Sequence, residues 1–254
     1  QLKLKGHADL HFKETLYSAD IYLDNLDAKM KIHPLKMEKF KGRFHVEDEH
    51  LLVENFAGKM GHSSFNMNLN YYYGDDKKIR KRDNYFSIVA PRLDLDELSN
   101  YTPPAKDEVV NHDSIFNIYD LPFTDMKFDL NIGQLNYHKY KLANVNGSLR
   151  TNEKHYVYVD KLDLDVAAGH IKVKGYLNGE NSKAIYFSPD IAFKKLDIDK
   201  LMLKFDNFGQ DEFVSDNLHG FISGRLTGKI HMHTDMVPII DDSEIHLDFE
   251  VLEG

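Results

Sequence analysis

The sequence predicts a mainly β protein: an elongated, curved antiparallel sheet that forms an open groove, built from about two repeat units with one or two short helices. Apolar and polar residues alternate along many segments, for example in SEIHLDFEVL near the C-terminus, and this pattern is typical of strands with one apolar face. Tyrosine (14 residues) and phenylalanine (16) are abundant, and aromatic side chains favour strands. Helical spacing is confined to two short stretches, DELSNYTPP and DKLMLKFDNFG.

The alternation assigns an apolar side to each expected strand in chain order. In FDLNIGQLNY (128–137) the apolar side slips by one residue, which predicts a bulge near Gly133. In YVYVDKLDLDV (156–166) we expect Tyr156 and Tyr158 on the same side as Leu162.

Two similar stretches, RLDLDEL (92–98) and KLDIDKL (195–201), indicate an internal repeat. The sequence around Gly42 also resembles that around Gly147. We therefore expect a first β repeat unit over residues 1–101, a connecting loop over 102–114, and a second unit with closing strands over 115–254. The two units are expected to form one continuous elongated domain.

Composition excludes several classes of function. The net charge of −9 argues against nucleic acid as a partner, because phosphate binding needs a basic face. The chain has no cysteine, so thiolate metal sites and cysteine nucleophiles are excluded. No apolar run of 18 residues is present, so any membrane attachment would come only through a segment absent from these 254 residues.

The paired aspartates of the repeat are candidates for acid–base or metal chemistry: Asp94 and Asp96, then Asp197 and Asp199. Strand alternation turns them away from the apolar side, which favours a solvated face whose last aspartate caps the next turn. They would form a glycosidase-like site only if carboxylates converged in a cleft.

Two further features allow a binding role. His231 and His233 in HMH lie two residues apart, a spacing that can supply two metal ligands, but ordinary surface histidines are the favoured interpretation. The basic stretch KKIRKR (77–82) is interpreted as a loop tip, with a patch for anionic lipid headgroups as the alternative. No catalytic signature is present, so we expect no catalytic residue, no metal and no cofactor.

The order and spacing of these motifs resemble the AsmA family, specifically the C-terminal regions of AsmA-like and TamB-like envelope proteins. The resemblance covers residues 36–254. The second copy of the repeat matches best, at Asn144, Val145, Gly147, Leu149, Ala168, Gly169, Ile171, Val173, Gly175 and Leu177. The first copy matches more loosely, at Phe40, Gly42, Phe44, Gly61, Phe65 and Leu69.

This resemblance implies a periplasmic, non-enzymatic protein, anchored in the bacterial inner membrane in its full-length form. It implies a role in outer-membrane biogenesis and phospholipid transport, with a phospholipid or other acyl-chain lipid as partner and envelope proteins as further partners. The alternatives are a closed β scaffold for protein–protein interaction and a carbohydrate-active β protein.

An open sheet with one apolar face provides a trough that fits acyl chains, whereas a closed sheet would use the same residues as its core. The residues expected to line the trough are Phe65, Met67, Leu69, Leu130, Ile132, Leu162, Leu164, Ile171, Val173, Ile230, Met232, Ile245, Leu247 and Phe249. For any single residue, a place in a closed core is favoured over contact with a lipid. For the set as a whole, the closed core and the open trough are equally favoured.

Overall fold

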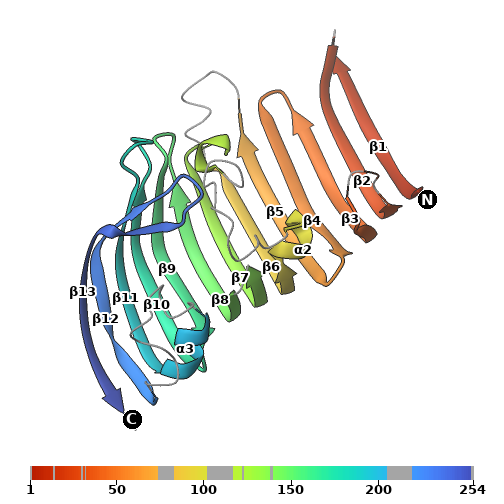
Figure 1. The fold of residues 1–254 in the computed structure, drawn as a ribbon. Helices are drawn as coiled ribbons and strands as arrows, with labels where there is room; N and C mark the ends of the chain where they lie inside the picture. The colour runs from red at the N-terminus through yellow and green to blue at the C-terminus, as the bar shows by residue number, and fades with distance from the viewer. Residues whose placement is uncertain are drawn as a thin grey trace. The chain divides into compact units, whose positions relative to one another are not determined.

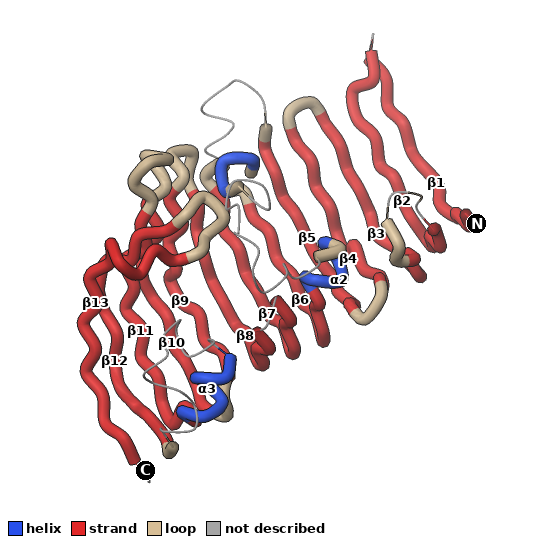
Figure 2. The backbone as a smooth tube through the Cα atoms, viewed as in Figure 1, coloured by secondary structure: helices blue, strands red, loops and turns tan. Residues whose placement is uncertain are grey.

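The chain is mainly β in the computed structural model, as the sequence predicted. Thirteen strands and three short helical segments lie in the residues that the structure describes, which are 2–13, 15–29, 31, 33–73, 83–101, 117–121, 123–137, 140–204 and 219–252. Strands account for most of this part of the chain (Figure 2). The expected loops at 77–82 and 102–114 lie outside it.

Contacts between Cα atoms divide the chain into two compact units. Unit 1 comprises residues 1–103 and 125–138, and unit 2 comprises residues 104–124 and 139–254. The contacts thus group the strand at 126–137 with the N-terminal strands, whereas the repeat alignment placed it after the connecting segment.

Unit 1 is a single sheet whose strands follow one another in chain order (Figure 1). Its elements are β1 (Leu2–Lys13), β2 (Thr15–Lys29), β3 (Lys36–Glu47), β4 (His50–Met60), β5 (Ser63–Tyr72), β6 (Tyr85–Asp94), the helix α2 (Leu95–Ser99) and β7 (Met126–Tyr137). Five neighbouring pairs are antiparallel. The sheet is mostly antiparallel, as the sequence predicted, and β6 and β7 are an exception because they run parallel. A tight hairpin joins antiparallel strands, whereas parallel strands need a long connection between them. β6 continues into α2 instead of a hairpin, and β7 begins only at Met126, so the connection is long enough for a parallel pair.

Unit 2 is also a single sheet in chain order, and each of its strand pairs from β8 to β13 is antiparallel. Its elements are the 3₁₀ turn η1 (Ile118–Asp120), β8 (Tyr140–Thr151), β9 (Tyr156–Val166), β10 (Gly169–Asn178), β11 (Tyr186–Asp197), the helix α3 (Ile198–Lys204), β12 (Phe221–Met232) and β13 (Pro238–Leu252). Strands β12 and β13 bend along their length (Figure 1).

The internal repeat is visible as a shared order of elements. Four strands followed by a short helix occur twice, as β3–β6 with α2 and as β8–β11 with α3. Corresponding residues Lys39 and Asn144 both have a left-handed backbone, with φ of 54° and 50°. RLDLDEL and KLDIDKL are therefore the same junction between a strand and a helix.

Each unit is one layer thick in its described strands, and no second sheet of described residues covers either apolar side. Few large apolar side chains are buried, among them Phe40, Leu93, Leu177 and Leu196. A closed sandwich would bury most of the inward side chains of two sheets. The prediction of an open sheet is confirmed for each unit.

Candidate functional site

The apolar side of unit 1 is continuous from strand to strand. Residues paired across a sheet point to the same face, so the register identifies which side chains are neighbours. One row runs through six strands, β2 to β7: Ile21, Phe44, Val53, Leu69, Phe86 and Phe128. The rings of Phe86 and Phe128 lie 5.9 Å apart between centroids. The row is an uninterrupted apolar band across the sheet.

The apolar side of unit 2 is continuous in the same way. One row joins five strands, β9 to β13: Leu162, Val173, Ile191, Leu226 and Leu247. A second row beside it contains Leu164, Ile171, Phe193 and Phe249, with Gly224 between the last two. We call these two surfaces the apolar faces of unit 1 and unit 2.

The fourteen residues predicted from the sequence lie on these faces, five in unit 1 and nine in unit 2. Ile132 and Leu164 are buried. Ile245, Leu247 and Phe249 are 40%, 46% and 57% exposed, and the remaining predicted residues are half-buried. Most of the predicted residues thus remain accessible in part on one side.

Sequence reasoning missed several apolar residues of the same faces. Phe44 in unit 1 and Ile191 and Phe193 in unit 2 stand in the rows described above. Their alternation, in GRFHVE and DIAFKK, is a signal that could have identified them. Met232 was predicted to line the trough. It packs against a cluster at one end of unit 2 rather than in the middle of the apolar face.

That cluster closes one end of the apolar face of unit 2. Ile118 of η1 packs against Leu177 and Ile185, and all three are buried. Tyr119 donates a hydrogen bond from its hydroxyl to the carbonyl of Gly179, and burial raises the pKa of this tyrosine. The side chain of Ile118 in the 3₁₀ turn therefore covers the apolar face at this end of the strands.

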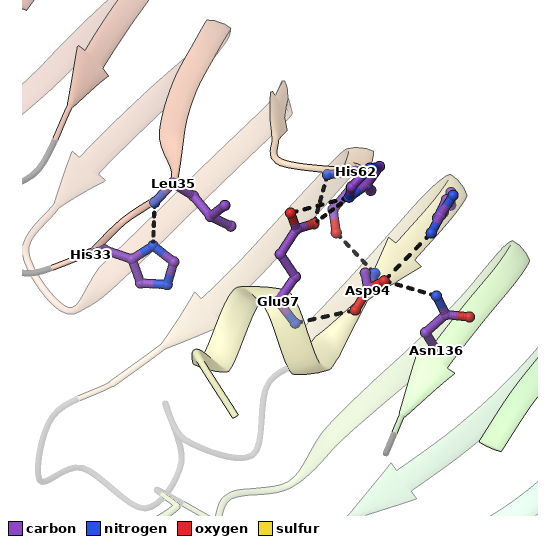
Figure 3. A network of polar contacts seen from close by, with 8 residues as sticks. His33, Leu35, His62, Asp94, Glu97 and Asn136 are labelled. Atoms are coloured by element: carbon purple, nitrogen blue, oxygen red, sulfur yellow. Dashed lines mark hydrogen bonds and ion pairs between the residues drawn. The ribbon is translucent and has the colours of Figure 1, made fainter. Parts of the chain in front are cut away.

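In unit 1, the helix α2 is fixed to the turn between β4 and β5 (Figure 3). The Glu97 carboxylate accepts a 2.7 Å hydrogen bond from the backbone N–H of His62, and it lies 3.1 Å from Nδ1 of the same residue. A ring nitrogen of His33 lies 2.8 Å from the carbonyl oxygen of Leu98. These contacts hold both the side and the end of the helix.

Asp94 and Asp197 cap the two helices, so the expectation that Asp96 and Asp199 do so is wrong. Asp94 accepts the backbone N–H of Glu97, and Asp197 accepts that of Lys200, at 3.1 and 3.0 Å. Each strand ends two residues earlier than the alternation indicated. Asp94, the last residue of β6, keeps the extended backbone that a cap requires.

The capping aspartates are held in their charged form. Burial of Asp94 opposes the charge, but hydrogen bonds from Asn136, from the N–H of Glu97 and from Arg92 outweigh it and lower the pKa of this carboxyl. The pKa of Asp197 is lowered by the ammonium of Lys200, 2.8 Å away, together with the capping hydrogen bond. Both carboxylates therefore stabilise the local structure where a strand passes into a helix.

Tyr156 and Tyr158 lie on the opposite side from Leu162, contrary to the sequence expectation. The register of β9 against β8 and β10 shifts near Asp160, and such a bulge moves the following side chains to the other face. The apolar positions of this segment are instead Val157 and Val159. On the polar side Tyr156 and Tyr158 stack with a ring distance of 5.8 Å.

No three His, Asp or Glu side chains of the described residues are close enough to hold a metal ion. His231 of the HMH stretch lies beside Tyr186, with 6.4 Å between ring centroids. Within the described ranges, no helix is both long and apolar enough to cross a membrane.

The chain matches no family model, no curated protein sequence and no solved structure.

Proposed function

We propose that the protein is a non-enzymatic lipid-binding segment that shields acyl chains along its apolar faces. The resemblance to AsmA-like proteins supports placing this activity in the bacterial periplasm, in phospholipid transport and outer-membrane biogenesis. In this proposal the partner is a phospholipid or another acyl-chain lipid, and membrane attachment comes from a segment outside these residues.

One observation supports the proposal most directly: a continuous row of apolar side chains that remains partly exposed. Leu247 and Phe249 are about half exposed, although they belong to rows of four or five apolar residues. Contiguous exposed apolar area of this kind marks surfaces that bind a partner. Acyl chains fit it because each buried methylene contributes about 0.8 kcal/mol without requiring a polar contact.

The sealed scaffold receives less support, because a sealed core would bury the inward side chains. The carbohydrate-active alternative requires two carboxylates that converge in a cleft. Asp94 and Asp197 instead cap helices.

The test uses charge on the apolar face of β13. We expect lipid to copurify with the protein and to appear by mass spectrometry of an organic extract. Leu247→Glu and Phe249→Glu place a carboxylate among the apolar rows at positions exposed enough to tolerate it, so both should lower the lipid content and the binding of a fluorescent fatty acid.

His246→Glu is the matched control, because it adds a negative charge to the same strand on the polar side. This variant should keep wild-type lipid binding. A clean extract from the wild-type protein together with no fatty-acid binding would reject the proposal. Equal losses in the control and the two test variants would reject the assignment of the face.

A further inference from the structure

The apolar face of unit 2 is closed at one end of its strands. Ile118 packs against Leu177 of β10 and against Ile185, which precedes β11, and each of these three side chains is at most 3% exposed. Phe187 of β11 packs against the same cluster. An acyl chain would have to displace Ile118 to reach this part of the face.

The other end of the same strands is closed as well. Val166 at the end of β9, Leu196 near the end of β11 and Ile198 at the start of α3 are 6%, 4% and 9% exposed. Because β10 and β11 are antiparallel, Leu196 and Leu177 lie at opposite ends of the strands. Side chains that are already buried offer a lipid little further apolar area.

The middle of the face is open between these two closed ends. The row described above crosses β9 to β12 through Leu162, Val173, Ile191 and Leu226, and each of these side chains is half-buried. Leu247 of β13 continues the row and is 46% exposed. Neighbouring strands lie about 4.8 Å apart, so the four strand spacings of this row cover about 19 Å.

Along a strand, the open apolar surface is short. On β11, Ile191 and Phe193 are half-buried and stand between Pro189 and Leu196, which are both buried. Two residues of a strand cover about 7 Å. The hydrocarbon core of a bilayer is about 30 Å thick and contains two layers of chains, so one chain of a membrane lipid spans about 15 Å. Such a chain fits along the row but not along the open part of a strand.

We infer that a bound acyl chain lies across the strands of unit 2, along the row from Leu162 to Leu247. This inference rests on the proposed function, because it assigns a direction to a chain on a face that is proposed to bind lipid. Each further strand that the chain crosses adds apolar contact, so the ligand class is a lipid with a long, extended chain. Short chains cover only part of the row and should bind more weakly.

The experiment locates the bound chain with single tryptophans, since the protein has none of its own. Leu162→Trp and Leu247→Trp place the indole at the two ends of the row, and Phe187→Trp places it at a closed strand end. The probes are two fatty acids that carry a nitroxide, which quenches nearby tryptophan, close to the carboxyl end or close to the methyl end. Each row variant should be quenched by at least one probe, and Phe187→Trp by neither. Equal quenching of Phe187→Trp would overturn the inference.

A charge in the middle of the row provides the decisive measurement. Ile191 stands two strands from each end, so Ile191→Glu should displace one chain from both ends at once. In the Leu162→Trp and Leu247→Trp backgrounds it should raise the probe concentration for half quenching about tenfold. Ala192→Glu is the matched control, because it adds the same charge to the opposite, exposed side of the same strand and should leave quenching unchanged.

If Ile191→Glu leaves quenching unchanged at one or both ends, separate chains lie along separate strands and the inference is overturned. Circular dichroism checks that each variant keeps its strands, and Ile191→Gln replaces Ile191→Glu if the glutamate variant does not fold. A wild-type protein that binds neither fatty acid rejects the proposed function. A protein that binds them but shows the wrong pattern of quenching rejects the direction of the chain alone.

Discussion

Gly58 shows how a single residue allows the aromatic packing on the apolar face of unit 1. Phe40 is almost fully buried, at 2% exposure, and its ring lies directly over Gly58. A Cβ atom at this glycine would lie 2.5 Å from Cδ2 of Phe40. The phenyl rings of Phe56 and Phe65 lie within 6 Å of Phe40, at 5.3 and 5.8 Å between centroids, so the ring has little room to shift.

We expect Gly58→Ala to destabilise the protein by about 1–3 kcal/mol, because overpacking forces rings off their preferred positions. The measurement is the free energy of unfolding in urea. Phe40→Leu combined with Gly58→Ala should cost less than the sum of the two single changes, since the smaller side chain makes room for the added methyl group. Strictly additive effects would show that the clash is absent.

The importance of Gly58 could not be predicted from the sequence. Phe40 belongs to the preceding strand, and only the register of β3 against β4 brings its ring over this glycine. The apolar residues with plain alternation, such as Phe65 and Leu247, were predictable, because one strand alone determines which side they face.

At the scale of elements, the strand-to-helix junctions depend on Asp94 and Asp197. We expect Asp94→Ala to lower the free energy of unfolding by about 1–2 kcal/mol, because the N–H of Glu97 loses its acceptor. Asp94→Asn keeps an oxygen at that place and should recover part of the loss. Urea unfolding measures both, and an alanine variant as stable as the wild type would contradict the capping role.

This junction also predicts a dependence on pH. The pKa of Asp94 is lowered from its ordinary value of 3.8 by folding, so its contribution is complete above that value and is lost as the pH falls through the lower folded value. The Asp94→Asn variant lacks this contribution. Its stability should therefore fall less steeply than that of the wild type below about pH 4, as followed by urea unfolding at each pH. Parallel pH profiles would rule out a lowered pKa.

The limits of element prediction have physical causes. Alternation located β5, β10 and β13, but it does not state where a strand ends, so the caps were assigned two residues too late. The bulge near Asp160 reversed the sides of Tyr156 and Tyr158, because a bulge depends on the partner strand as well as on its own residues. The packing of Ile118 against Leu177 and Ile185 joins residues that are far apart in the sequence, so no local sequence pattern predicts it.

At the scale of the whole molecule, exposed apolar residues are found on both units. Phe12 belongs to unit 1 and Phe249 to unit 2, and both are more than half exposed. The folded protein should therefore strongly enhance the fluorescence of an apolar dye such as anilinonaphthalene sulfonate, without denaturant.

This dye test separates an open face from a sealed core. Added fatty acid should displace the dye and lower its fluorescence, while circular dichroism stays unchanged. If the native protein does not enhance the fluorescence of the dye, the sealed scaffold is favoured over the proposed lipid-binding face.

The parallel pair β6–β7 has a consequence for how the protein is made. Hairpins such as β3–β4 join residues that leave the ribosome together, whereas Asp94 and its partner Asn136 are 42 residues apart. Closing that loop costs chain entropy before any contact forms. Strands β1 to β6 can thus assemble first. The outer edge of β6 then stays unpaired until β7 has been synthesised. During this interval the nascent chain presents an unpaired strand edge, which can pair with a wrong strand.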